Sequence, residues 1–196
     1  AGISGIGAAL LAKSRGHDVW VSDGMEIKAE RKTILEQHNI SFEEKGHQLE
    51  RLVACDIIIK SPGIANTSEI LLALTDAGKE IIGEIEWAYR NADGKIIGIT
   101  GSNGKTTTTG LCHHFLQAAG LDAAKVGNVG EGFCHFLAEH NAAWYVCELS
   151  SFQLEDVETF RPRIGILLNI TPDHLDRYEY SLDKYADAKM RMMRNM

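Results

Sequence analysis

The sequence predicts an α/β fold in which parallel strands alternate with helices. Apolar runs such as residues 55–59 and 95–100 are continuous, as strands buried on both faces are, and stretches with helical spacing of apolar residues lie between such runs. Two glycine-rich turns, at residues 1–5 and 98–110, each open one of these helical stretches. Because parallel strands need crossover connections, this alternation predicts parallel sheets with helices on their faces.

The composition is that of a globular protein without a basic surface. The chain has 196 residues, of which 44% are hydrophobic and 24% charged, and its net charge is −7. This balance argues against a nucleic-acid partner. The sequence shows neither a signal peptide nor an apolar run of about 18 residues. We therefore expect a cytoplasmic protein without a membrane segment. We also expect a monomer, although the composition does not indicate the oligomeric state.

The first 92 residues predict a Rossmann-like domain. A glycine turn opens a helix at residues 4–15, and a strand at residues 19–21 ends just before Asp23. An acidic residue about 20 positions beyond such a turn holds a ribose hydroxyl in dinucleotide-binding domains. The alternative is tight helix-to-strand packing with a solvated Asp23. The strand expected before the turn is missing, and the chain ends within a helical pattern, so we expect a piece of a longer protein.

The alternation continues up to a polar turn at residues 91–94. The expected strands are 55–59 and 80–82, and the expected helices are 26–38, 67–77 and 84–90. The first of these strands ends in Ser61-Pro62-Gly63, a rigid turn at a strand's carboxyl end, which is where open sheets bind ligands. We place a domain boundary between residues 92 and 93, because the polar turn precedes a new strand.

A phosphate-binding loop is predicted between a strand at residues 95–100 and a helix at residues 106–120. In GITGSNGKTTTTG, glycines let backbone N–H groups converge on phosphate oxygens, Lys105 adds a mobile charge and Thr106 offers a hydroxyl to Mg²⁺. The strict motif has a glycine where Ile99 stands. A plain strand-to-helix connection is the alternative. The expected ATP-binding residues are Gly101, Ser102, Asn103, Gly104, Lys105, Thr106 and Thr107.

Residues 93–196 therefore predict part of a P-loop-type α/β ATPase domain. Its further strands are expected at 123–126, 142–147 and 164–169, and a last helix at 181–194. Glu148 stands at a strand tip, where an acid completes a Mg²⁺ site beside a phosphate loop, or is simply solvated. Ser150 begins an unusual cluster of hydroxyl and amide side chains, and the alternative to a functional role is that the cluster caps a helix and does nothing more. His174 is either a surface residue or a ligand, and Lys189 has no role by sequence physics alone.

Several separated motifs together resemble the Mur ligases. They are GITGSNGKTT, GNVG at residues 127–130, ELSSFQLE at 148–155, NITPDHLDRY at 169–178 and SPGI at 61–64. The resemblance covers essentially the whole chain. Ser-Ser-Phe-Gln after the strand-end glutamate indicates the members that join D-glutamate to UDP-N-acetylmuramoyl-L-alanine, with ATP, in peptidoglycan precursor synthesis.

The resemblance also implies roles for single residues. Lys105 and Thr106 would hold the ATP phosphates and a first Mg²⁺, with Glu148 as that ion's second protein ligand. His174 would bind a second Mg²⁺ together with Lys189, which is carbamylated in the family. The implied substrate-binding residues are Ile3, Ser4, Asp23, Gly24, Ser61, Pro62, Gly63, Asn128, Ser150 and His174. One departure concerns the uracil or diphosphate contacts, because Gly24-Met25 stands where a Thr-Arg pair can occur.

Three alternatives remain open. A dinucleotide-binding oxidoreductase or redox-sensing module with NAD would explain the first glycine turn and Asp23, but it leaves the phosphate loop and Glu148 unexplained. Another amide ligase of the same superfamily would act on a different amino acid or on folate. The third is that these 196 residues bind ligands without catalysing ligation.

Overall fold

The first half of the molecule contains two separate parallel ladders. The computed structural model describes all 196 residues. Strand β1 (Trp20–Ser22) pairs with β2 (Ser41–Glu43), and β3 (Ile57–Lys60) pairs with β4 (Glu80–Gly83). The strands are parallel, as expected, and no ladder joins the two pairs. The helices here are α1 (Ile3–Ser14), α2 (Ala29–Gln37), α3 (Leu49–Val53), α4 (Glu69–Asp76) and α5 (Glu84–Arg90).

The second half is built on one four-stranded parallel sheet. Its strands are β5 (Lys95–Thr100), β6 (Ala123–Gly127), β7 (Trp144–Glu148) and β8 (Ile164–Leu167), in the order β6-β7-β5-β8. Its helices are α6 (Lys105–Ala118), α7 (Phe133–Glu139), α8 (Ser151–Leu154) and α9 (Leu182–Met190), with 3₁₀ turns η1 (Leu175–Tyr178) and η2 (Arg191–Met193). Because β5 lies between β7 and β8, the carboxyl ends of these three strands adjoin, which is where such sheets bind ligands.

Sequence signals set most element ends but miss the shortest elements. Gly16 and Gly78 follow α1 and α4 with φ values of 84° and 71°, which glycine adopts without strain. The elements β2, α3 and α7 were not expected. Strand β2 has only three residues and forms by pairing with β1, a tertiary contact that its own pattern does not reveal. The expected helix 181–194 is α9 followed by η2.

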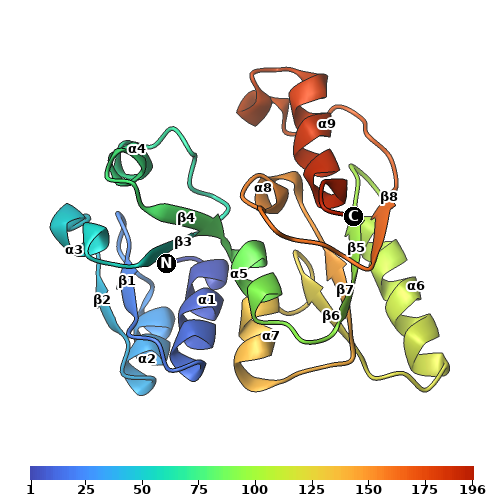
Figure 1. The fold of residues 1–196 in the computed structure, drawn as a ribbon, viewed down its shortest axis with the longest axis horizontal. Helices are drawn as coiled ribbons and strands as arrows, with labels where there is room; N and C mark the ends of the chain where they lie inside the picture. Colours follow the sequence, from blue (N-terminus) through green and yellow to red (C-terminus); the bar gives the residue numbers. More distant parts are fainter.

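The main hydrophobic core crosses the expected domain boundary. Helix α7 of the second half packs against α1 and α5 of the first half (Figure 1). The shared core includes Leu11, Ile85, Phe133, Leu137 and Tyr145. A Cβ atom on Gly94, in the turn between the halves, would lie 2.2 Å from the carbonyl oxygen of Ala142. The halves are therefore packed together, and domains over residues 1–92 and 93–196 are our proposal from the polar turn alone.

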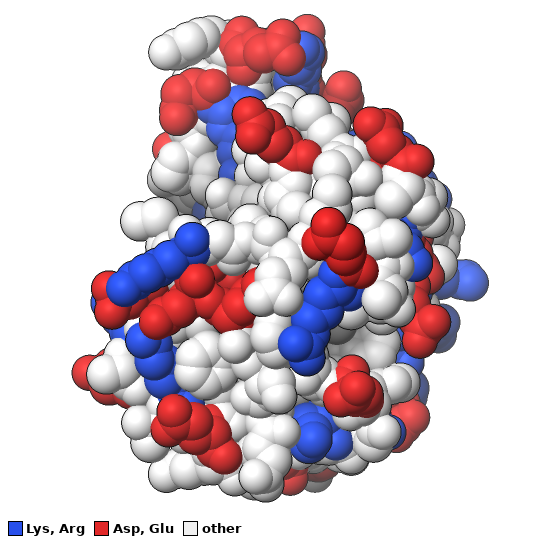
Figure 2. All heavy atoms as spheres, turned by 90° about the vertical axis from the view of Figure 1, so that its left-hand side faces the viewer, with Lys and Arg blue, Asp and Glu red and all other residues white.

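The surface of the first half carries charges of both signs. Figure 2 shows basic and acidic side chains interspersed on the face formed by this half. Exposed or half-buried ion pairs such as Lys32–Glu44 and Lys45–Glu26 contribute to this pattern. No helix is both long enough and apolar enough to cross a membrane.

A buried carboxylate on α5 ties the two halves together. Glu86 is fully buried and accepts hydrogen bonds from the backbone N–H groups of Glu158, Thr159 and Phe160, and from Arg90. Burial by itself raises the pKa of this carboxyl. The hydrogen bonds to its charged form outweigh that effect, so the pKa of Glu86 lies below its ordinary value.

Phe133 gives a test of the shared core. Its side chain is fully buried, with its ring 5.0 Å from that of Tyr145. We expect Phe133→Ala to lower the free energy of unfolding by about 3–5 kcal/mol, through lost burial and the cavity left behind. Phe115→Ala is the control, because Phe115 is 64% exposed and should change stability by no more than about 0.5 kcal/mol. Urea unfolding followed by tryptophan fluorescence measures both, and equal effects would contradict the shared core.

Glu86 gives a pH-dependent test. A carboxyl whose pKa is lowered in the fold stabilises it fully above its unfolded pKa, close to 4.5, and this contribution is lost as the pH falls through the folded value. We expect Glu86→Gln to destabilise the protein by about 2 kcal/mol at pH 7 and by progressively less below about pH 4.5.

The matched control for this prediction is Glu80→Gln. Glu80 contacts the same Arg90 but its side chain is 47% exposed, so its loss should matter little at either pH. Denaturant unfolding of the three proteins across this pH range is the measurement. A pH-independent difference between wild type and Glu86→Gln would show that the buried charge is not what stabilises the contact.

Candidate functional site

The loop between β5 and α6 has a backbone that only glycines allow. Gly101 has φ of 148°, and Gly104, the residue before α6, has φ of 85°. The loop is held from outside by the Asn169 side chain, which accepts a hydrogen bond from the Asn103 N–H at 3.0 Å and donates one to the Asn103 carbonyl at 3.1 Å. The motif therefore forms a fixed loop at the start of a helix, the arrangement that binds phosphates.

A hydroxyl pair connects this loop to the end of the chain. The Ser102 hydroxyl donates to the Thr171 carbonyl and accepts from the Thr171 N–H, both at 2.9 Å, and lies 3.1 Å from the Tyr185 hydroxyl. The phosphate loop, the segment after β8 and helix α9 thus form one connected unit.

Two lysines converge on one carbonyl oxygen of the loop. Lys105 Nζ donates to the Gly101 carbonyl at 2.8 Å and to that of Ser102 at 2.9 Å, and Lys189 Nζ donates to the Gly101 carbonyl at 2.9 Å. Neither ammonium forms an ion pair with a carboxylate. Burial lowers the pKa of Lys189 to about 8, and the nearby charge of Lys105 adds to this effect. The site therefore concentrates positive charge that a bound anion would offset.

Glu148 places a buried carboxylate oxygen without a partner at the end of β7. Glu148 is 1% exposed, and its backbone lies opposite that of Ile99 in the parallel pair of β7 and β5. One carboxylate oxygen accepts a hydrogen bond from Asn128 Nδ2 at 3.0 Å, while the other is buried and has no hydrogen-bond partner. A buried, unsatisfied anionic oxygen is costly unless a cation binds it.

These residues fit an open magnesium site and not a closed one. No three His, Cys, Asp or Glu side chains lie close enough to hold a metal ion by themselves. Mg²⁺ usually takes one or two protein ligands and completes its shell with phosphate oxygens and water. The unpartnered oxygen of Glu148 and the exposed Thr106 beside the phosphate loop suit that mode.

His174 is not in contact with the other candidate ligands. Its side chain is 58% exposed, with Nε2 3.7 Å from Asp173 Oδ2 and its ring 5.2 Å from that of Phe152. No hydrogen bond or ion pair connects it to Glu148 or Lys189. It has a left-handed backbone with φ of 48°, which is unusual for a residue other than glycine. Its role as a ligand stays a prediction.

Ser150 caps the short helix α8. Its hydroxyl accepts a hydrogen bond from the Gln153 N–H at 3.3 Å, and the Gln153 side chain accepts one from the Ser150 N–H at 3.0 Å. This reciprocal pair is a capping box, so the prediction that the cluster caps a helix is confirmed. A contact of Ser150 with substrate stays a prediction.

The candidate residues of the first half gather at the start of α1. Ile3 is exposed, and a Cβ atom on Gly5 would lie 3.1 Å from the Ser61 hydroxyl, so the turn after β3 is next to the glycine turn. The Asp23 carboxylate accepts a hydrogen bond from the Met25 N–H at 2.8 Å and contacts the amino group of Ala1.

His47 lies beside Gly24 and was missed by the sequence analysis. A Cβ atom on Gly24 would lie 3.0 Å from His47 Nε2, and His47 Nδ1 is 2.6 Å from the Ser22 hydroxyl. A single exposed histidine outside any motif gives no signal in the sequence. The His47 imidazole thus occupies the space beside Gly24, where the family can have a Thr-Arg pair in place of Gly24-Met25.

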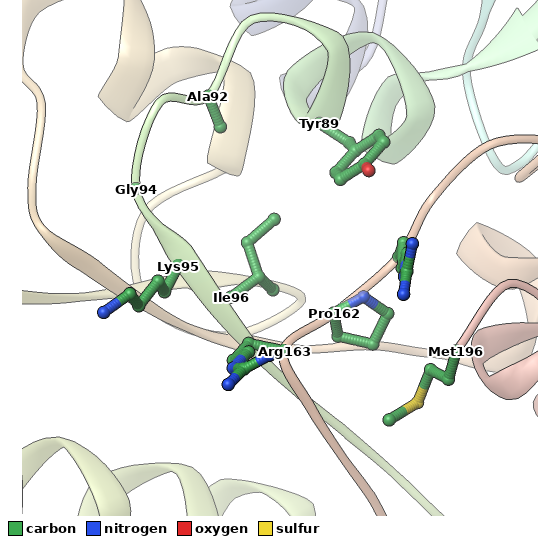
Figure 3. Close-up of a pocket in the computed structure, with 9 residues that line it drawn as sticks. Tyr89, Ala92, Gly94, Lys95, Ile96, Pro162, Arg163 and Met196 are labelled. Carbon is green, nitrogen blue, oxygen red and sulfur yellow. The ribbon is translucent and has the colours of Figure 1, made fainter.

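A cavity of 480 Å³ lies beside the first residues of β5 (Figure 3). Lys95, which begins β5, is in its lining, whereas the phosphate loop follows the opposite end of the same strand. Its lining residues are Tyr89, Ala92, Gly94, Lys95, Ile96, Arg161, Pro162, Arg163 and Met196. The Lys95 ammonium lies 5.1 Å from the centre of the Trp144 ring. No candidate residue lines this cavity, so it is separate from the site.

Lys189 gives a stability test of the convergent charges. It is 2% exposed and shares the Gly101 carbonyl with Lys105. Because a buried cation without a carboxylate partner is costly, we expect Lys189→Met to raise the free energy of unfolding at pH 7 by about 1–3 kcal/mol. Lys184→Met on the same helix is the control, since Lys184 is exposed. Urea unfolding is the measurement, and a less stable Lys189→Met variant would contradict the charge argument.

Models of two known protein domains match the two halves of the chain separately. A model of the Mur ligase middle domain matches residues 99–196, which is half of the chain, and one of the MurD N-terminal domain matches residues 7–70. A UDP-N-acetylmuramoylalanine–D-glutamate ligase from Bacteroides fragilis is 49% identical over 195 residues, covering 100% of this chain. Its counterpart from Salinibacter ruber is 40% identical and covers 98% of this chain. The chain spans only 44% and 43% of the lengths of these two relatives.

Solved structures show the same fold. The ligase for UDP-N-acetylmuramate and L-alanyl-γ-D-glutamyl-meso-diaminopimelate from Neisseria meningitides has a TM-score of 0.67 at 20% identity, over 100% of this chain and 66% of that one. The UDP-N-acetylmuramate–alanine ligase from Thermotoga maritima has a TM-score of 0.59 at 25% identity, over 99% of this chain and 46% of that one. With a family model over half its length and the phosphate loop within that match, the chain belongs to the Mur ligase family.

Proposed function

We propose that this chain is the nucleotide-sugar-binding part and a portion of the ATP-binding part of a ligase that joins D-glutamate to UDP-N-acetylmuramoyl-L-alanine. The observation that carries the proposal is the convergence of Lys105 and Lys189 on the loop carbonyl of Gly101, in a sheet where Glu148 has an unpartnered oxygen. The names of the relatives that match the whole chain supply the substrates. The reaction would take place in the cytoplasm, and we propose that the protein acts as a monomer.

The phosphate loop is the proposed ATP site. Its backbone N–H groups and the start of α6 would face the phosphates, and Lys105 would move from its carbonyl partners to the phosphate oxygens. The ammonium already lies at the loop, so little rearrangement is needed. The residues assigned to ATP are Gly101, Ser102, Asn103, Gly104, Lys105, Thr106 and Thr107.

Two Mg²⁺ ions are assigned to four side chains. Thr106 and Glu148 would hold the first, and His174 and a carbamylated Lys189 the second. The ions supply charge stabilisation for phosphoryl transfer. Lys189 suits carbamylation because an amine with a pKa of about 8 is partly neutral near neutral pH, and the neutral amine is the form that reacts with CO₂. The carbamate is an anion, which relieves the repulsion from Lys105.

The nucleotide-sugar is assigned to the first half and to the edge of the site. Its uridine would lie against Ile3, Ser4, Asp23, Gly24 and the turn from Ser61 to Gly63, which gather at the start of α1. Asn128, Ser150 and His174 would face the muramoyl end. Asn128 donates a hydrogen bond to Glu148, which is a proposed ligand of the first Mg²⁺. A muramoyl carboxylate beside Asn128 would therefore lie next to the proposed ATP site.

The proposed reaction has two steps, phosphoryl transfer and amide formation. The alanyl carboxylate takes the γ-phosphoryl group of ATP, which gives an acyl phosphate and ADP. The amine of D-glutamate then attacks the acyl carbon, the amide bond forms, and inorganic phosphate leaves with the C–O bond electrons while the amine loses a proton. The role of Lys105 is to offset the charge on the transferring phosphoryl group.

Turnover by a protein of the relatives' length that carries these residues tests the proposal. We expect phosphate release from ATP only with UDP-N-acetylmuramoyl-L-alanine and D-glutamate together, since the amine must consume the acyl phosphate. Lys105→Ala and Lys189→Ala should each abolish turnover, and Lys125→Ala, at an exposed position on β6, should not. The 196 residues by themselves should form no amide.

Other outcomes separate the alternatives. Phosphate release from ATP that depends on another amino acid or on folate would favour a different ligase of the superfamily. Binding of NADH without binding of the nucleotide-sugar, measured by calorimetry on the 196-residue chain, would favour a dinucleotide-binding module. Full activity of Lys189→Ala with no response to added bicarbonate would remove the carbamate from the proposal.

A further inference from the structure

Arg177 connects the segment that carries His174 to the turn from Ser61 to Gly63, where the nucleotide-sugar is proposed to bind. It lies on η1, three positions after His174, in the segment that follows β8. Its Nε and Nη2 atoms donate to the two carboxylate oxygens of Glu155 at 3.0 and 2.7 Å. Nη2 also donates to the carbonyl oxygen of Pro62 at 3.0 Å, in the turn after β3. One guanidinium thus joins the His174 segment to the Ser61–Gly63 turn.

The guanidinium is held in one geometry from several sides. Tyr178 donates its hydroxyl hydrogen to Glu155 at 2.6 Å, which fixes the carboxylate, and the Arg177 guanidinium lies 4.5 Å from the centre of the Phe152 ring. The same ring contacts His174. A two-pronged arginine–carboxylate pair stacked on an aromatic ring restrains direction as well as distance. The orientation of His174 therefore depends on neighbours that Arg177 also contacts.

A second bridge holds the other end of the same turn. Lys60, with a fully buried side chain, lies 2.7 Å from Asp156 Oδ2 and donates to the Ile64 carbonyl at 2.9 Å. Asp156 also accepts a hydrogen bond from Asn66 at 3.1 Å. Because Glu155 and Asp156 are adjacent, two consecutive carboxylates anchor both sides of the turn to the second half.

Polar contacts supplement incomplete apolar packing at this point. A cavity of 480 Å³ lies beside the bridges, and Asn66, Glu155 and Asp156 are in its lining. The shared hydrophobic core reaches this point as well, because Leu154 and Val157, which flank the two carboxylates, belong to it. A two-pronged arginine–carboxylate pair restrains direction as well as distance, so the bridges add an orientational restraint to the apolar packing.

We propose that Arg177 is a positioning residue that fixes the Ser61–Gly63 turn relative to the His174 segment, so that a nucleotide-sugar held by the turn presents its carboxylate to the metal and ATP site. The inference rests on the proposed function. Arg177 acts through Pro62, Glu155 and Phe152, and its donors are already used there. The phosphate loop is held by Asn169 and Thr171, which precede Arg177 in the same segment, and Arg177 itself has no contact with the loop, so KM for ATP should change little.

Steady-state kinetics of the full-length protein test this role with three variants. Arg177→Gln removes the two-pronged pair, Arg177→Lys keeps the charge, and Arg161→Gln is the control, because Arg161 is exposed and its side chain has no hydrogen bond or ion pair. For Arg177→Gln we expect kcat/KM for the nucleotide-sugar to fall by about tenfold to a hundredfold. The Mg²⁺ concentration for half-maximal rate should rise, while KM for ATP stays within about twofold. Arg177→Lys should recover part of the loss, and Arg161→Gln should match wild type.

Amide hydrogen exchange gives a readout that does not need activity. We expect Arg177→Gln to speed exchange at both residues 61–64 and residues 173–176, and Arg161→Gln to speed neither. Glu155→Gln, which weakens the same pair from the other side, should act in the same direction and replaces Arg177→Gln if that variant folds poorly.

Two outcomes overturn the inference, and a third concerns the function alone. A lower melting temperature with unchanged KM values and unchanged Mg²⁺ dependence would make Arg177 merely structural. Faster exchange in only one of the two segments would show that they are not coupled. If wild type has no ligase activity, the proposed function fails, and faster exchange in both segments would still support the coupling.

Discussion

The carbonyl oxygen of Gly101 is the point on which the proposed site depends. It accepts hydrogen bonds from Lys105, at the start of α6, and from Lys189, on α9 near the end of the chain. Two ammonium groups can share one acceptor only if the backbone turns its carbonyl toward both, and the φ of 148° at Gly101 is a conformation that favours glycine. A bound anion would relieve the repulsion between these cations, which is why phosphate is the proposed ligand of the loop.

The order of the strands supplies the counterpart of this charge. Because β7 is next to β5, Glu148 at the end of β7 lies opposite Ile99. Ile99 is the next-to-last residue of β5, and the phosphate loop follows this strand. The buried carboxylate oxygen that lacks a partner thus lies at the edge of the sheet where β5 ends, and the Gly101 carbonyl that binds the two lysines follows β5. Positive and negative groups that do not pair with each other can be bridged by a metal ion and a phosphate. This arrangement is how an acidic protein would hold the proposed anionic nucleotide.

The two halves meet in different ways at different places. Around α1, α5 and α7 they share a packed apolar core, and Glu86 adds a buried polar contact between α5 and the backbone of residues 158–160. Near the turn after β3 they meet through Arg177 and Lys60 across a cavity. The first contact determines that the halves stay together. The second lies where two proposed substrates would approach each other, and directional contacts there add an orientational restraint.

The sequence by itself determined the elements whose signals are local. The buried run of β5, the glycines and lysine of GITGSNGKTTTTG and the start of α6 follow one another along the chain, so steric freedom, burial and charge could be inferred from spacing alone. The strand-end position made Glu148 a candidate, whereas the metal-ligand roles of His174 and Lys189 came from the resemblance to a family. Helix α7 and strand β2 were missed, because a helix of seven residues and a strand of three depend on what they pack against.

Only the tertiary structure decided which distant residues meet. Nothing in the sequence around Lys189 indicates that its amine is buried against Gly101, and nothing around Arg177 indicates that it contacts Pro62. The first half is two ladders and not one sheet, since pairing depends on neighbours in space and not on the pattern within a strand. Periodicity and motifs report which face of an element is buried. The fold alone determines the partner on that face, because contacts between elements depend on how the whole chain packs.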